Sequence, residues 1–357
     1  WVNTFADFPE WGLERLPTTS LPSWYPSIGA VAQISSGTTI GSAVRANNGN
    51  NYPGTDPDDI VEPWSGGALV QVGGQPYLVV QGGGHGDSGF NGIVMFGPLS
   101  GAGSDTPTWQ TFLAPSALGD VRDAPTYLDG RQSSVHTYNN IVGVDDTLYA
   151  MATDGHYNIG FSFDLAFSFT PAGQVSLSPN SVRGSMFGCC RHHDGKIYYI
   201  AGGPRWDRLR IYDIASDSWS SEANADVPFS NYVSMGLDTT RGKILVVNKE
   251  IGFYWDIATL ARVSAPAAAP NYDRAITYDP DRDAFISYAG GQTIYELDAA
   301  ELASGASPDW TQRVFTGAVP AASAPAKTFG RFQYVPELKG YIVAPQLESD
   351  VYFMRSA

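Results

Sequence analysis

Short apolar runs alternate with tight polar turns along most of this chain, and the pattern repeats. One unit is an apolar strand, a polar turn, a second apolar strand, a glycine-rich or polar loop and a third short strand. The first unit, GGALVQVGGQPYLVVQGGGH, turns at Gly73-Gly74, and the third, SMFGCCRHHDGKIYYIAGGPRW, turns at Asp194-Gly195. Runs of this length between turn residues are typical of strands. Only LDAAELASG indicates a helical turn, so we expect an all-β fold.

Six such hairpins occur, and the other four turn at Asp145-Asp146 and near Gly242, Arg282 and Lys339. Their spacing is close to the roughly 40–50 residues of a four-stranded propeller blade. Third strands are expected at IVMF, GFSFDL, LRIYDI, GFYWDI, TIYELD and VYFM, and tryptophans 109, 219 and 310 mark outer strands. We predict a β-propeller, with six blades favoured and seven as the alternative.

The sixth unit ends without an outermost strand, and we expect the N-terminal segment to supply it. FPEWGLERLPTT is the predicted closing strand, and closure of this kind removes an exposed sheet edge. The stretch from Ser27 to Asp59 is either a long connection or a degenerate seventh blade. The predicted organisation is one domain over residues 1–357, with the closing strand and long connection in 1–60 and six blade repeats in 61–357.

The loop GGGHGD, with His85, resembles a phosphate loop only at first sight. A dinucleotide fingerprint requires a helix after its glycines. Here Ile93-Val94-Met95-Phe96 follows, which is typical of a strand. We therefore expect the glycines to turn the chain tightly and to bring His85 inward.

Composition and net charge limit the kinds of partner that this chain is expected to bind. The net charge of −15 argues against a nucleic-acid or bilayer surface, so an anionic partner would need a local basic patch. No apolar run approaches the length of a membrane span, and we expect no membrane insertion. The chain starts at Trp1, which is compatible with removal of a leader, and a secreted or periplasmic monomer is the expectation.

Few residues in the sequence indicate metal binding or a reactive thiol. Cys189 and Cys190 are neighbours, and we expect two reduced, structural strand cysteines rather than a disulfide. Cys190 and His192 share one side of a strand, which suits structural zinc, but zinc usually needs four ligands and no second cluster supplies them. Calcium at NNYPGTDPDDI is the other metal considered. Solvated turn histidines and a solvated acidic loop are the simpler interpretations.

Propeller topology predicts where the polar residues gather. In each blade strand a is innermost, so the connections into strand a and the loops between strands b and c emerge on one face. His136 precedes the inner strand of the second unit, and Tyr138, two residues on, lies on the same side. The residues predicted at this mouth are His85, His136, Tyr138, His156, Tyr157, Arg183, Arg205, Trp206, Tyr232, Arg274 and Arg331. For each, packing or a structural hydrogen bond is the alternative role.

The segment KIYYIAGGPRWDRLRIYDIASDSW resembles a kelch repeat: an apolar strand, a double glycine, an aromatic strand and a tryptophan. The resemblance extends over about 300 residues and implies the propeller fold. It leaves the function open, because propellers include enzymes and scaffolds.

The predicted mouth carries histidine, tyrosine and arginine without a paired-carboxylate motif or a G-x-S-x-G elbow, which disfavours standard glycosidases and serine hydrolases. The set suits β-elimination on a uronate-containing, sulfated or unsulfated polysaccharide. Here the chain resembles propeller-fold polysaccharide lyases such as ulvan lyases. The resemblance implies His136 and His156 as the histidine pair, Arg205 as the carboxylate clamp, and Tyr157 or Tyr138 as the base. The competing hypothesis is a non-catalytic propeller that binds glycan or protein at the same mouth.

Overall fold

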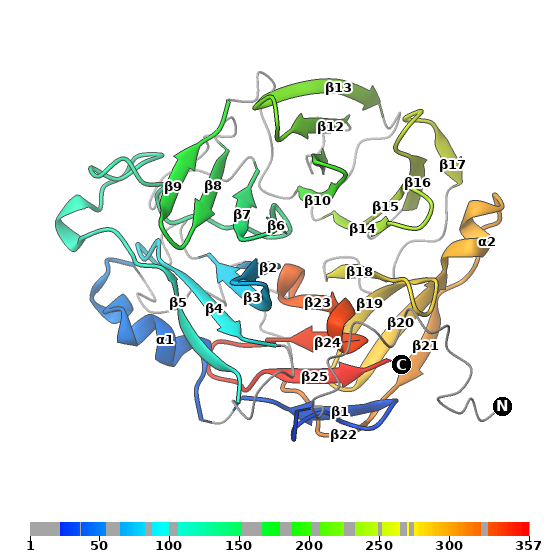
Figure 1. Ribbon diagram of the computed structural model, residues 1–357, viewed down its shortest axis with the longest axis horizontal. Coiled ribbons are helices and arrows are strands. Elements are labelled where there is room, and N and C mark those ends of the chain that lie inside the picture. The colour runs from blue at the N-terminus through cyan, green and yellow to red at the C-terminus, as the bar shows by residue number, and fades with distance from the viewer. Residues whose placement is uncertain are drawn as a thin grey trace.

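The computed structural model describes residues 22–35, 37–54, 65–82, 88–99, 106–151, 166–178, 188–200, 208–224, 233–248, 252–264, 270, 275–322 and 328–356. These residues form six antiparallel sheets fanned around a common centre (Figure 1). The six-bladed β-propeller predicted from the sequence is therefore confirmed, and no seventh sheet occurs among the described residues.

Each of the first five blades has four strands in chain order from the centre outward. Blade one contains β2 (Gly66–Val72), β3 (Gln75–Gln81), β4 (Ile93–Gly97) and β5 (Thr108–Leu113). Blade two contains β6 (Ile141–Val144), β7 (Thr147–Ala150), β8 (Phe167–Thr170) and β9 (Gly173–Ser176). Blade three contains β10 (Cys189–His193), β11 (Lys196–Ile200), β12 (Arg208–Asp213) and β13 (Ser218–Asn224).

Blades four and five repeat this order. Blade four contains β14 (Ser234–Asp238), β15 (Lys243–Val247), β16 (Gly252–Asp256) and β17 (Arg262–Ser264). Blade five contains β18 (Ile276–Asp279), β19 (Ala284–Gly290), β20 (Thr293–Asp298) and β21 (Thr311–Val314). The short helix α2 (Ala299–Ala303) follows β20, where LDAAELASG predicted a helical turn.

Blade six joins the two ends of the described chain. It contains β23 (Phe332–Val335), β24 (Gly340–Val343) and β25 (Tyr352–Arg355) from the C-terminal part, then β1 (Ala30–Gln33) and β22 (Thr316–Gly317) at its outer edge. β1 pairs antiparallel with β25, with Val31 opposite Met354, and parallel with β22. The expected closure by an N-terminal strand is confirmed, but its position differs. The closing strand is Ala30–Gln33, and the predicted segment FPEWGLERLPTT lies outside the described residues.

One other strand differs from the prediction. The third strand of blade two is β8, Phe167–Thr170, whereas GFSFDL had been expected; that segment also lies outside the described residues. The stretch from Ser27 to Asp59 contains β1, the helix α1 (Ile40–Ala46) and the short 3₁₀ helix η3 (Gly49–Asn51). Three further 3₁₀ helices are η4 (Leu118–Asp120), η5 (Phe329–Arg331) and η6 (Pro336–Leu338).

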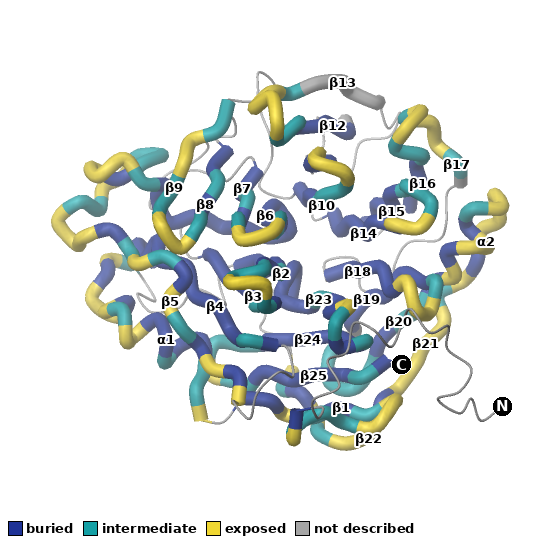
Figure 2. The backbone as a smooth tube through the Cα atoms, viewed as in Figure 1, coloured by how far each residue is buried: buried dark blue, intermediate teal, exposed yellow. Residues whose placement is uncertain are grey.

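The core consists of apolar clusters between neighbouring blades. In β3, Leu78 and Val80 pack toward blade six, while Val79 between them packs toward blade two. Successive side chains of a strand point to opposite faces, and both faces of this second strand are covered. This explains why second strands such as KILVV in β15 are apolar at nearly every position. In Figure 2 the inner strands are buried, and the exposed residues lie mainly in turns and in outer strands such as β21.

Candidate functional site

The entrances of the inner strands and the exits of the second strands lie at the same end of the propeller. The register demonstrates this in four blades, because Gly66 pairs with Gln81, Ile141 with Ala150, Ser234 with Val247, and Ile276 with Ser287. This end is the predicted mouth. Of the predicted site residues, His136, Tyr138 and Arg331 are described. The others, His85, His156, Tyr157, Arg183, Arg205, Trp206, Tyr232 and Arg274, lie outside the described residues.

His136 and Tyr138 form a hydrogen-bonded pair on the connection into β6. The distance between His136 Nδ1 and Tyr138 Oη is 3.1 Å, and the rings meet edge to face. Both side chains are buried, with 2% and 3% of their surface exposed. The sequence placed these two residues on one side of the chain, and the structure brings their polar atoms together. Because either His136 Nδ1 or Tyr138 Oη can hold the shared proton, the pair has groups capable of proton transfer.

Tyr138 is held by an aromatic contact that joins two blades. Its ring packs edge to face against Phe329, from the η5 connection into β23, with 5.3 Å between centroids. The backbone of both residues is in the left-handed region, with φ of 44° and 43°. A positive φ is uncommon for aromatic residues and costs on the order of 1 kcal/mol, so packing must hold each one there. The aromatic contact therefore fixes the position of the phenol.

Arg331 lies at the same end, but inside the wall rather than at an open surface. It is fully buried, and its guanidinium donates hydrogen bonds to the carbonyl oxygens of Ser65, Ala344 and Pro345. These contacts tie blade six to the start of blade one. They are sufficient to account for a buried arginine here, so Arg331, predicted to bind substrate, does not enter the function proposed below.

Buried neutral polar side chains lie at the same end of the propeller as the His136–Tyr138 pair. Thr137 Oγ1 accepts from Gly66 N at 2.7 Å, and Gln81 Nε2 donates to Gln132 Oε1 at 3.1 Å. The buried side-chain oxygens here that lack a hydrogen-bond partner among the described residues include Ser65 Oγ, Gln81 Oε1, Ser134 Oγ, Asn139 Oδ1 and Ser287 Oγ. A buried polar atom without a partner usually indicates a bound water or ligand group. Amide and hydroxyl oxygens of this kind suit the hydroxyl groups of a sugar.

Two side chains that the sequence analysis did not select reach across the centre of the propeller. Asn139, before β6 of blade two, donates from Nδ2 to Val233 O and Ser234 Oγ at the start of blade four, each at 3.3 Å. Arg191, on β10 of blade three, donates to Ile276 O at the start of blade five at 2.7 Å. Each contact spans the inner strand of an intervening blade, so both side chains lie near the centre of the propeller.

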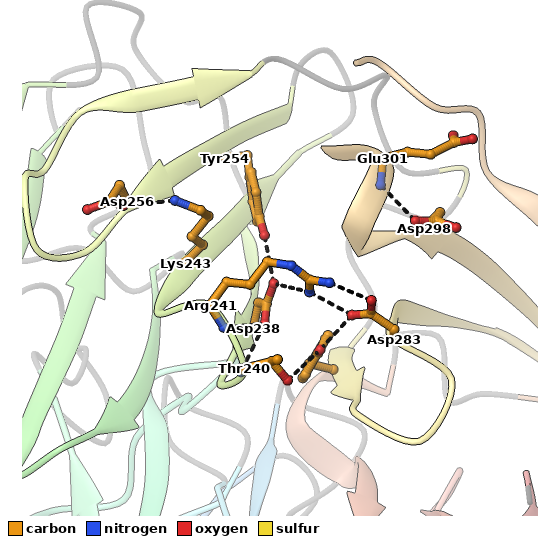
Figure 3. Close-up of polar contacts among 10 residues, drawn as sticks. Asp238, Thr240, Arg241, Lys243, Tyr254, Asp256, Asp283, Asp298 and Glu301 are labelled. Carbon is orange, nitrogen blue, oxygen red and sulfur yellow. Dashed lines mark hydrogen bonds and ion pairs between the residues drawn. The ribbon is translucent and has the colours of Figure 1, made fainter. Parts of the chain in front are cut away.

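The opposite end of the strands carries acidic turns tied by ion pairs (Figure 3). Asp238 ends β14 and accepts from Tyr254 Oη at 2.8 Å and from Arg241 at 3.0 Å. Arg241 also contacts Asp283 of the next blade. Lys243 pairs with Asp256 at 2.8 Å on the same side of blade four. These residues cross-link neighbouring turns, and their contacts are structural.

His192 and His193 lie on β10 next to the turn at this opposite end, as predicted. Burial lowers the pKa of His192, so its neutral form is favoured. The two cysteines are free and buried, and burial raises the pKa of the Cys190 thiol to about 12. They are therefore inert thiols at neutral pH. In the described part of the chain no group of three or more His, Cys, Asp or Glu side chains is placed to hold a metal ion.

Comparisons with known proteins identify the fold alone. No family model matches the chain, and no curated protein has significant sequence similarity to it. The structure of YjhT is similar with a TM-score of 0.52 and 11% identity, over 82% of this chain and 93% of that one. A chain in the crystal structure of the mitotic checkpoint complex is similar with a TM-score of 0.50 and 12% identity, over 100% and 99%. These likenesses support a β-propeller and carry no activity over to this chain.

None of the helices in the described ranges has the length and apolar character needed to cross a membrane.

Proposed function

We propose that this propeller is a polysaccharide lyase that cleaves a uronate-containing chain by β-elimination at the His136–Tyr138 pair. The observation that carries the proposal is the 3.1 Å contact between His136 Nδ1 and Tyr138 Oη at the predicted mouth. An anionic polysaccharide is the proposed partner. Action on such a polymer agrees with the secreted or periplasmic location expected from the sequence.

The reaction needs a base for the proton on C5 of the uronate and an acid for the leaving oxygen on C4. Tyr138 passes its phenolic proton to His136 Nδ1, and the phenolate takes the C5 proton. The C4–O bond then breaks, a C4=C5 double bond forms, and the leaving oxygen takes up a proton. His136, now protonated, is the proposed donor of that proton. Both rings are buried, so the sugar must displace the residues that cover them.

The test is incubation with a panel of uronate polysaccharides while the ultraviolet absorbance of the C4=C5 product is followed. Tyr138→Phe removes one oxygen and keeps the ring contact with Phe329, so we expect the rate to fall by about a hundredfold or more. His136→Gln should have a similar effect. Tyr295→Phe, on β20 of blade five, is the matched control and should retain full activity. Full activity in Tyr138→Phe would overturn the proposed mechanism.

A non-catalytic glycan-binding propeller is the second candidate, and a different observation favours it. The unpartnered oxygens of Ser65, Gln81 and Ser134 would bind sugar hydroxyls without any proton transfer to carbon. This candidate predicts no absorbing product from any polymer, together with glycan binding that Tyr138→Phe leaves intact and Gln81→Leu weakens.

A further inference from the structure

Arg191 is a partly buried cation that has no acidic partner among the described residues. Its guanidinium donates to Cys190 O and to Ile276 O, each at 2.7 Å. A guanidinium has five N–H donors, and these two bonds leave others available. No carboxylate of the described residues lies within ion-pair distance of it. Burial lowers its pKa, as expected for a charge removed from water without an opposing charge.

The inner strands are electrically asymmetric along the propeller axis. Asp145, Asp194, Asp238 and Asp279 all lie at the turn where an inner strand ends. The described residues that lead directly into these strands, Asn140, Gly188, Val233 and Ala275, include no acidic side chain. An anion that approaches from the mouth therefore meets Arg191 before it meets the ring of aspartates.

Asn139 contacts the same residue as this cation. Its backbone oxygen accepts from Cys190 N at 3.0 Å, and Arg191 donates to the carbonyl oxygen of that cysteine. Asn139 is 1% exposed, and its Oδ1 has no hydrogen-bond partner among the described residues. The centre of the propeller thus holds a charged donor without a carboxylate partner and a neutral acceptor without a donor, both in the described part of the chain.

We propose that a small hydroxy-carboxylate binds at the centre of the propeller, between Arg191 and Asn139. Its carboxylate accepts hydrogen bonds from Arg191, and its hydroxyl donates to Asn139 Oδ1. The carboxylate supplies the missing negative charge, and the hydroxyl supplies the missing donor. This site does not depend on whether the protein cleaves a polysaccharide, because binding there needs neither His136 nor Tyr138.

The site can be tested by isothermal titration calorimetry at constant ionic strength with three ligands of matched size. Sodium lactate carries both groups, sodium propionate lacks the hydroxyl, and lactamide lacks the charge. Lactate should bind most tightly, with propionate weaker by several-fold and lactamide weaker by about tenfold or more. This comparison uses the unmodified protein, so it is decisive even where a variant does not fold. Equal affinities for the three ligands, or no binding of lactate, would overturn the proposal.

Two variants then assign the contacts. Arg191→Met should lower the affinity for lactate by about tenfold or more. Arg262→Met removes the same charge from the exposed strand β17 and should leave the affinity for lactate unchanged. Asn139→Leu should remove the preference for lactate over propionate and retain propionate binding. Near-ultraviolet circular dichroism establishes that each variant is folded. Unchanged lactate affinity in folded Arg191→Met contradicts the site.

Discussion

Arg241 in blade four and Asp283 in blade five form a two-pronged ion pair, with N–O distances of 2.6 and 2.5 Å (Figure 3). The same guanidinium also contacts Asp238, whose side chain is fully buried, whereas 39% of the Asp283 side chain is exposed. The arginine thus links two carboxylates in different surroundings, and removing either end of the network should have different consequences.

We expect Arg241→Met to lower the free energy of unfolding by about 3 kcal/mol, because it leaves the buried Asp238 carboxylate without its cation. Asp283→Asn should cost about 1 kcal/mol or less, since water screens that exposed carboxylate. Urea unfolding of both variants measures the difference. Equal losses would mean that the inter-blade bond, rather than the charge of Asp238, accounts for the stabilisation.

Asp256 gives a prediction for acid stability. The hydrogen bond from Lys243, followed by those from Thr259, lowers the pKa of Asp256 to about 2 from an ordinary value of 3.8. Because the folded-state pKa is the lower one, this stabilisation is present above about pH 4 and is lost as the pH falls toward 2. Solvent screens this ion pair, so Asp256→Asn should lower the free energy of unfolding by about 1 kcal/mol at pH 7 and by almost nothing near pH 2.

Unfolding curves recorded across this pH range provide the check. Asp309→Asn, which neutralises an exposed aspartate before β21, serves as the control and should change stability little at any pH. A loss in Asp256→Asn that persists unchanged at low pH would contradict the assignment to the ionised carboxylate.

Gly143 lies where the inner strands of blades one and two approach most closely. A β-carbon there would lie 1.6 Å from the carbonyl oxygen of Leu69 in β2, which is backbone and cannot rotate away. Gly143→Ala should therefore lower the free energy of unfolding by about 3 kcal/mol or prevent folding, because the two blades must separate. Gly119→Ala has open space around it and should be neutral or slightly stabilising. Thermal unfolding compares the two, and similar midpoints would exclude the close approach.

The blade pattern could be predicted because turn chemistry and strand apolarity agree locally. Asp194 and Gly195 both adopt positive φ in the tight turn between β10 and β11, as do Gly73 and Gly74 between β2 and β3. Residues that tolerate this conformation mark hairpins in the sequence. Trp109 and Trp219 lie in outer strands as expected, and Trp310 immediately precedes one.

The positions that sequence reasoning missed depend on distant partners. AVAQ, the closing strand β1, is short and weakly patterned, and its pairing with β25 and β22 selects it. In blade two, GFSFDL is as strand-like as the segment that pairs with β7, so apolarity alone does not choose between them.

The candidate site was predicted in part. The spacing of His136 and Tyr138 indicated a shared side, and their polar atoms are in contact. Arg191 was missed, although a signal exists: it is a charged residue in the middle of an inner strand, two positions after the buried Cys189 and on the same face. Its partner oxygen on Ile276 lies in a blade that no local pattern links to it.

The pairing of β1 with β25 places neighbours in space that are separated by more than three hundred positions. During synthesis on the ribosome, Ala30–Gln33 emerges early, and the edge of this strand that pairs with β25 must wait for Tyr352–Arg355. Nascent chains therefore carry an unpaired edge until translation has passed blade six. Unfinished chains can associate at that edge, and slower elongation would prolong its exposure.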